Sequence, residues 1–313
     1  MHSWKTAKNL FTKTVLLTWL LPATVFAGDI IDATGASVSV SDSPKKIVTL
    51  VPSLAELAAD IAEENIGRIV GVSEYSDYPP ALEKVESIGP YFHFNLEKVV
   101  SLKPDLVLGT MDGNSKDQVM HLRELKLPVV IVSTENFAQV EDSMRIVSDA
   151  MGASSRAAQM ITQFRTGLSR IRERASERAK KNSGKKLKVL LQIGADPLVV
   201  AGRKSFLNEA LETIGAVNAY GDVEARYPRP SMEDVIKRGP DLIVVLALGR
   251  KKGPFQAMAR DWGRFKNIPA VKRKQVFIVV ADPLFRPTLR LLEGLSMLEK
   301  IVEKNINAQS QNI

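Results

Sequence analysis

Apolar residues along the chain follow two alternating patterns. Short runs rich in β-branched and aliphatic residues predict strands, because a strand of a buried parallel sheet is apolar on both faces. Between these runs, apolar residues recur every three or four positions, which predicts amphipathic helices such as Ser53–Glu64, Leu96–Leu102 and Ser205–Ile214. Strand, helix and strand at this spacing predict parallel sheets with right-handed crossovers, and therefore an α/β fold. The predicted strands are Ile47–Val51, Ile69–Val72, Asp105–Gly109, Val129–Val132, Lys188–Ile193, Asp241–Leu246 and Val276–Val280.

A longer helix is predicted in the middle of the chain, from about Ser155 to Lys181. At 1.5 Å per residue it would be roughly 40 Å long, a strut that joins two lobes and permits only small opening motions. Its apolar positions form one stripe: Ala157, Ile161, Phe164, Leu168, Ile171 and Ala175. We therefore expect a lead segment at 28–45, a first α/β lobe at 46–152, this linker helix at 153–185 and a second α/β lobe at 186–313.

The chain contains an internal repeat. LEKVVSLKPDLVL begins at Leu96, and MEDVIKRGPDLIV begins 136 positions later. Each copy predicts a short helix, then a proline, then a buried strand. The matching pairs are Glu97 with Glu233, Val99 with Val235, Val100 with Ile236, Pro104 with Pro240, and Asp105 with Asp241.

The repeat places one acid in the first turn of each short helix. Asn95 and Ser231 precede the two copies and are suitable N-caps, which puts Glu97 and Glu233 where a negative charge stabilises a helix. That contribution alone would account for the acids. The alternative is that two lobes related by a pseudo-twofold axis present them at equivalent places.

The first 27 residues predict a cleavable signal peptide. Three lysines precede an apolar stretch from Val15 to Phe26, and Val25 and Ala27 put small residues before Gly28. We expect export to the periplasm and removal of 1–27; an uncleaved N-terminal anchor is the alternative. The chain has no cysteine, so neither a lipid at the cleavage site nor a disulfide can form. We expect a free, monomeric periplasmic protein.

Charge and composition exclude several functions. Loss of 1–27 removes three lysines and no acid, so 40 basic and 35 acidic residues leave a net charge of +5. The excess lies between Arg165 and Lys186, with no interleaved aromatic to stack a base, so we expect a solvated helix face and no nucleic-acid partner. Only His93 and His121 remain after cleavage, too few for a zinc site of clustered His and Cys.

A hydrolase is the rival class. Ser53 follows a strand and opens a helix, but Val51 and Ala55 stand where a nucleophile elbow needs glycine. Ser53 with Glu56 predicts a capping box instead. We expect no catalytic residue, no enzyme activity and no enzyme cofactor.

Aromatic residues gather in loops that follow predicted strands or precede the repeats. Tyr75 and Tyr78 follow one strand, Tyr91 to Phe94 precede the first repeat, and Tyr227 precedes the second. Ligands of parallel α/β sheets bind beyond the carboxyl ends of the strands, so these residues are candidates to contact one. Packing against their own lobe is the alternative. Asp282 and Arg286 follow the last strand and could bond a ligand's polar groups, or simply each other.

Three segments carry a resemblance. GVSEYSDYPP (71–80), NLEKVVSLKPDLVLG (95–109) and SMEDVIKRGPDLIVV (231–245) resemble periplasmic cobalamin-binding proteins, the vitamin-delivering partners of an ABC importer. The likeness runs over roughly 46–303. It implies a class III periplasmic binding protein, with two Rossmann-like lobes bridged by a single long helix. It further implies that cobalamin, or a related corrinoid, is captured between the lobes and delivered to a permease dimer with its ATPase. The wider family also binds heme and ferric siderophores, which remain alternatives.

The resemblance also assigns roles to residues. Tyr75 matches a tyrosine that contacts cobalamin. Glu97 and Glu233 match two glutamates, one per lobe, that dock onto arginines of the permease. A D-x-x-x-R segment that lines the corrin matches Asp282, Pro283, Leu284, Phe285 and Arg286.

The sequence departs from the family pattern near the expected ligand. Thr110 and Tyr227 replace tryptophans, and the cysteine pair of the best-known members is absent. The loop before Asn95 is about two residues longer and carries His93. A neutral imidazole can ligate cobalt or iron, so His93 is a candidate axial ligand; a packed or exposed histidine is the alternative. No other residue is predicted to touch a metal.

Overall fold

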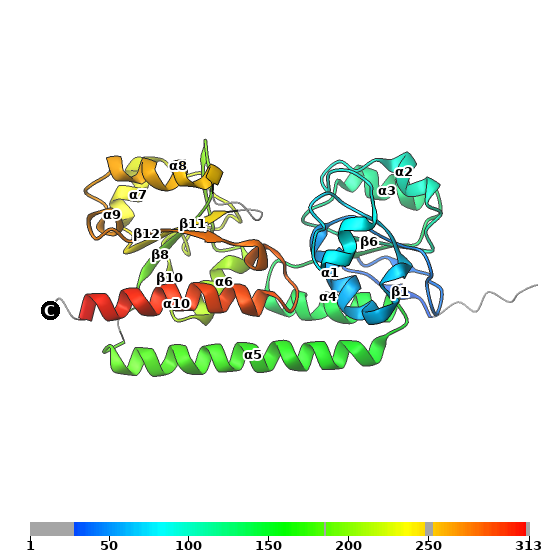
Figure 1. Ribbon diagram of the computed structural model, residues 1–313, viewed down its shortest axis with the longest axis horizontal. Helices are drawn as coiled ribbons and strands as arrows, with labels where there is room; N and C mark the ends of the chain where they lie inside the picture. The colour runs from blue at the N-terminus through cyan, green and yellow to red at the C-terminus, as the bar shows by residue number, and fades with distance from the viewer. Residues whose placement is uncertain (1–27, 185, 248–252, 311–313) are drawn as a thin grey trace, which may run out of the picture.

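The computed structural model describes residues 28–184, 186–247 and 253–310, so the predicted signal segment lies outside it. Figure 1 shows two α/β lobes side by side, with α5 (Ser154–Lys181) and α10 (Leu291–Ser310) running along the lower side of the molecule. None of the helices in the described ranges has the length and apolar character needed to cross a membrane. The predicted α/β class and the two-lobed arrangement are confirmed.

The first lobe is built on a five-stranded parallel sheet in the order β5-β4-β3-β6-β7. Strands β3, β6 and β7 are buried throughout, as a sheet covered on both faces requires. The strands are β3 (Ile47–Thr49), β4 (Ile69–Val72), β5 (Glu86–Ser87), β6 (Leu106–Thr110) and β7 (Val129–Val132), with β1 (Ile30–Ile31) and β2 (Ser37–Val38) as a separate antiparallel pair. The helices are α1 (Pro52–Ala62), α2 (Leu96–Ser101), α3 (Lys116–Glu124), α4 (Phe137–Ala150), η1 (Glu63–Arg68) and η2 (Pro80–Lys84).

The second lobe repeats this plan in the order β10-β8-β11-β12. One strand departs from the predicted parallel pattern: β9 pairs antiparallel with β8, because the chain reverses through Asp196-Pro197. The strands are β8 (Lys188–Ala195), β9 (Leu198–Val200), β10 (Val217–Asn218), β11 (Leu242–Ala247) and β12 (Val276–Val280). The helices are α6 (Phe206–Thr213), α7 (Met232–Arg238), α8 (Gly253–Asp261), η3 (Trp262–Arg264), α9 (Pro269–Lys272) and η4 (Asp282–Phe285).

The repeated aspartates have the same structural role in both lobes. Asp105 precedes β6 and accepts hydrogen bonds from the backbone N–H groups of Lys45 and Lys46 at 2.7 and 2.8 Å, where the chain enters β3. Asp241 precedes β11 and accepts one from Lys188 N, at the start of β8, at 3.0 Å. Each aspartate therefore ties the repeat strand to the strand that comes first along the chain in the main sheet of its lobe.

Two predicted helix caps are confirmed and one is wrong. Asn95 accepts a hydrogen bond from Lys98 N at 2.9 Å, and Ser231 accepts one from Asp234 N at 3.2 Å. The predicted Ser53–Glu56 capping box does not form: α1 begins at Pro52, and Val51 holds the cap position without a side-chain bond. Proline at the first helical position lacks an N–H and is already set for the helix, so Ser53 falls inside the first turn.

The lobes are joined by one long helix, as predicted, and a helix of the second lobe packs along it (Figure 1). The predicted helix from about Ser155 is α5, and α10 packs along it. Gly167 of α5 permits this close approach, because a Cβ at that position would meet Leu292 Cδ1 of α10 at 2.5 Å. Farther along, Glu299 of α10 pairs with Arg174 at 2.6 Å and Arg178 at 2.5 Å. One cluster of buried apolar residues runs from the first lobe through both helices into the second.

Candidate functional site

The two lobes touch through loops at the carboxyl ends of their strands. Two polar contact groups lie at this lobe junction, and a hydrogen bond from Phe137 N to Glu209 of α6 at 2.8 Å joins the lobes as well. One joins the loop after β4 and the start of α1 to the segment that follows β12. The other joins the loops after β6 and β7 to the loop before α7. Because β4 and β7 lie on opposite sides of β3 in the first sheet, the two groups flank the middle of the junction.

The first group contains the predicted Tyr75 and Arg286, which come from opposite lobes. Arg286 donates a hydrogen bond to the Tyr75 carbonyl oxygen at 2.9 Å and pairs with Asp282 at 3.0 Å. A second carboxylate, that of Asp77, lies 3.8 Å from Arg286. Tyr75 has a φ of 65° and its side chain is 73% exposed. The backbone of Tyr75 is therefore held while its ring stays free for another partner.

The buried carboxylate of Glu56 belongs to the same contact group and binds residues of the second lobe. Glu56 of α1 is 1% exposed, pairs with Arg290 at 2.7 Å and accepts a short hydrogen bond from Thr288. Burial raises the pKa of Glu56, although the bonds from Thr288 and Arg290 oppose the shift. Arg290 also lies 3.7 Å from the ring centroid of Tyr78 and 3.4 Å from Asp282. The sequence reasoning missed this cluster; its one local signal is an acid on the apolar face of a predicted helix.

The second group centres on Arg226. Its guanidinium pairs with Asp112 of the first lobe at 2.8 Å and lies 4.0 Å from Glu135. Burial raises the pKa of the neighbouring Tyr227; Asp112 and Tyr91, both from the first lobe, also raise it, and Arg226 opposes them. Tyr227 therefore lies near Asp112 and Tyr91 of the first lobe. Its predicted contact with a ligand stays a prediction.

Several large side chains with apolar surface are exposed around the lobe junction. Large exposed side chains mark binding sites when they gather in one place. Those around the junction are Tyr75, Tyr78, Tyr91, Phe92, Met111 and Tyr227. His93 is also exposed, in a turn closed by its N–H to the Pro90 carbonyl at 3.1 Å.

Two residues of the predicted D-x-x-x-R segment do not face the junction. Pro283 and Leu284 are buried in the second lobe, and Leu284 belongs to the core cluster. Their apolar side chains fix η4 in place. Asp282, Phe285 and Arg286 are only partly buried, so these three are the ones that a ligand could reach.

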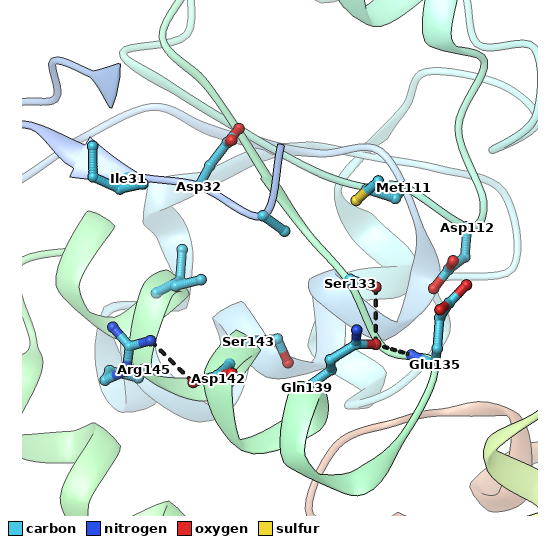
Figure 2. A pocket seen from close by; sticks show the side chains of 12 residues that line it. Ile31, Asp32, Met111, Asp112, Ser133, Glu135, Gln139, Asp142, Ser143 and Arg145 are labelled. Carbon is cyan, nitrogen blue, oxygen red and sulfur yellow. Dashed lines mark hydrogen bonds and ion pairs between the residues drawn. The ribbon is translucent and has the colours of Figure 1, made fainter. Parts of the chain in front are cut away.

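A hollow of about 610 Å³ lies on the first lobe, away from Tyr75 and Arg286. Figure 2 shows its polar lining, in which Gln139 bonds both Ser133 and the backbone of Glu135. It reaches Asp112 at one end but contains none of the predicted ligand residues, so we do not assign the ligand to it. Among the described residues, no group of three or more His, Asp or Glu could hold a metal ion.

The predicted docking residues lie outside the junction. Glu97 of α2 and Glu233 of α7 are both exposed, in the first turns of their helices. Figure 1 places α2 and α7 in different lobes, on the side of the molecule away from α5.

Comparisons with known proteins agree with this architecture. Residues 47–283 match the family described as periplasmic binding protein. A vitamin B12-binding protein of Salmonella typhimurium is 31% identical over 279 residues, 88% of this chain and 93% of that protein. An uncharacterised ABC transporter substrate-binding lipoprotein of Bacillus subtilis is 32% identical over 282 residues, 89% of this chain and 86% of that protein.

A solved structure shows the same fold. The periplasmic vitamin B12 binding protein of Vibrio cholerae superimposes with a TM-score of 0.71 at 26% identity, covering 84% of this chain and 98% of that chain. The two lobes, the single long linker helix and these matches lead to one conclusion: this chain belongs to the periplasmic binding protein family, as a substrate-binding protein of the kind that serves ABC transporters.

Proposed function

We propose that the chain binds cobalamin, or a related corrinoid, between its lobes. The observation that carries the proposal is the contact of Arg286 with the Tyr75 carbonyl, which brings an exposed aromatic of one lobe beside the charged segment of the other. The 31% identity to a vitamin B12-binding protein supports the choice of ligand.

A corrinoid combines a broad ring face with amide-bearing edges, and the lobe junction offers partners for both. The rings of Tyr75, Tyr91 and Tyr227 supply rigid apolar area with polar tips. Asp282 and Arg286 supply an acceptor and several donors for amide groups. Binding would part the existing Arg286–Tyr75 bond and replace it with bonds to the ligand.

Heme or a ferric chelate is the second candidate, favoured by one observation. Tyr91, Phe92 and His93 are exposed together in the loop before α2, and tyrosine and histidine are both known ligands of iron. Cyanocobalamin, dicyanocobinamide and hemin, titrated separately into the mature protein in a calorimeter, decide between the two. We expect one submicromolar site for a corrinoid. Binding of hemin alone would overturn the corrinoid proposal.

We further propose that the protein works as a periplasmic monomer that hands its ligand to a permease dimer with its ATPase. Glu97 and Glu233 would contact the two halves of that dimer. The signal segment predicted at 1–27 would direct export and then be removed. N-terminal sequencing of protein from the periplasmic fraction should begin at Gly28, and a chain that retains Met1 would contradict cleavage.

A further inference from the structure

The two helices that carry the predicted docking glutamates, α2 and α7, also share an exposed apolar side chain. In α2 and α7, the residue three positions after each glutamate is a β-branched apolar side chain, Val100 or Ile236. Residues three apart lie on the same face of a helix. Val100 is 37% exposed and Ile236 is 40% exposed, although their neighbours Val99 and Val235 are fully buried.

Neither apolar side chain is needed for the core of its lobe. Val100 does not belong to the cluster that buries Val99, and Ile236 does not belong to the one that buries Val235. A single exposed valine or isoleucine is ordinary on a protein surface. Val100 and Ile236, however, occupy equivalent positions in the two repeats, and each lies one helical turn after an exposed glutamate. The two helices therefore present the same combination of an acidic and an apolar side chain.

The other polar positions on the outer faces of the two helices, half-buried or exposed, are not matched in residue type. Lys98 stands where the second copy has Asp234, and Ser101 stands where it has Lys237. Both members of the first pair are also engaged within their own lobes: Lys98 pairs with Glu86, and Asp234 pairs with Arg238 at 2.9 Å. Within the described part of the chain, Glu97 and Glu233 make no ion pair.

We infer that Glu97 with Val100, and Glu233 with Ile236, are two equivalent docking patches for one two-fold symmetric protein partner. At each place the partner presents a cation beside an apolar side chain. This inference rests on the proposed delivery to a permease dimer and adds the apolar half of each contact.

Charge and symmetry argue against two other binding partners for these patches, a lipid surface and a second copy of this chain. An anionic lipid surface would repel both acids. A second copy of this chain, docked through equivalent patches, would bring acid against acid. A symmetric partner with basic groups meets both patches at once, and the two contacts then reinforce each other.

The test measures docking of the ligand-loaded mature protein to the cognate permease–ATPase complex in nanodiscs, by biolayer interferometry at several salt concentrations. Val100→Ala with Ile236→Ala should weaken docking about tenfold, because the apolar area lost on two side chains is worth roughly 1.4 kcal/mol. The salt dependence should stay as in the wild type, since no charge changes. Alanine favours a helix, so the fold should persist, and unchanged corrinoid affinity verifies it.

Two further variants separate the possible results. Glu97→Gln with Glu233→Gln should weaken docking and also flatten its salt dependence. Ile31→Ala with Met297→Ala, which trims two side chains that are 60% and 41% exposed away from α2 and α7, should dock as the wild type does.

The outcomes distinguish this inference from the proposed function. If the alanine pair docks normally while the glutamine pair is impaired, delivery stands and the apolar contribution is wrong. If both pairs dock normally, or the wild type does not dock at all, the proposed delivery through these helices is wrong as well. If the control pair is impaired equally, the loss is not specific to the patches and the inference fails.

Discussion

Arg290→Met should destabilise the protein more than any loss of a surface ion pair would. The change keeps much of the side-chain volume but removes the charge that faces Glu56, whose carboxylate is 1% exposed. Removing one partner of a buried pair costs about 3–5 kcal/mol, because the other charge stays buried without compensation. We expect about 3 kcal/mol at neutral pH, the low end of that range, since Thr288 still donates to Glu56.

The destabilisation caused by Arg290→Met should become smaller as the pH falls. Burial already raises the pKa of Glu56 above its ordinary value of 4.5, and Arg290 is one of the groups that restrain the shift. Without Arg290 the folded protein binds this proton still more tightly than the unfolded chain does. Stability is therefore regained as the pH falls through the raised pKa of Glu56 toward 4.5.

Urea unfolding at about pH 7 and about pH 5 measures both effects. Glu56→Gln with Arg290→Met should recover at least about 1.5 kcal/mol of the single variant's loss at the higher pH and remove its pH dependence. Arg145→Met is the matched control: Arg145 pairs with Asp142 at 3.0 Å, but both side chains are more than half exposed, so it should cost at most about 0.5 kcal/mol. A loss below about 1 kcal/mol for Arg290→Met, or one that does not change with pH, would refute the reasoning.

Three further predictions concern the ligand and the partner. Tyr75→Ala and Arg286→Ala should each weaken corrinoid binding by about 1–3 kcal/mol in calorimetry, and unchanged affinity in both would place the ligand elsewhere. Glu97→Lys with Glu233→Lys should abolish transport through the permease but leave the thermal midpoint and ligand affinity nearly intact; normal transport by this variant would contradict docking. If His93 ligates cobalt, binding should shift the visible spectrum of aquocobalamin and His93→Ala should remove the shift, whereas identical spectra would assign His93 to the surface.

Local patterns predicted most of the fold. The β-branched runs became strands because parallel strands are buried on both faces, and Asn95 and Ser231 became caps because a cap depends on residues three positions away. The stripe from Ala157 predicted α5 for the same local reason. In each case the deciding contacts lie within a few residues along the chain.

The parts that were missed depend on distant residues. Glu56 is held by Thr288 and Arg290, more than 230 positions away, so nothing beside it in the sequence reveals its partners. The capping box that was predicted for it failed because Pro52 moved the helix start. The left-handed backbone of Tyr75 has no local signal either, since that conformation is usual for glycine rather than for an aromatic residue. The candidate ligand site could therefore be predicted as a set of residues but not as a geometry.

The pairing of α10 with α5 has a consequence for how cooperatively the protein unfolds. Buried residues of α10 from Leu291 to Ile306 belong to the same core cluster as Phe164 and Leu168 of α5. Removing α10 from this cluster would expose the apolar stripe of α5 and part of the core of the second lobe to water, which is unfavourable. We therefore expect α10 (Leu291–Ser310), α5 and the parts of both lobes in this cluster to unfold in one cooperative transition.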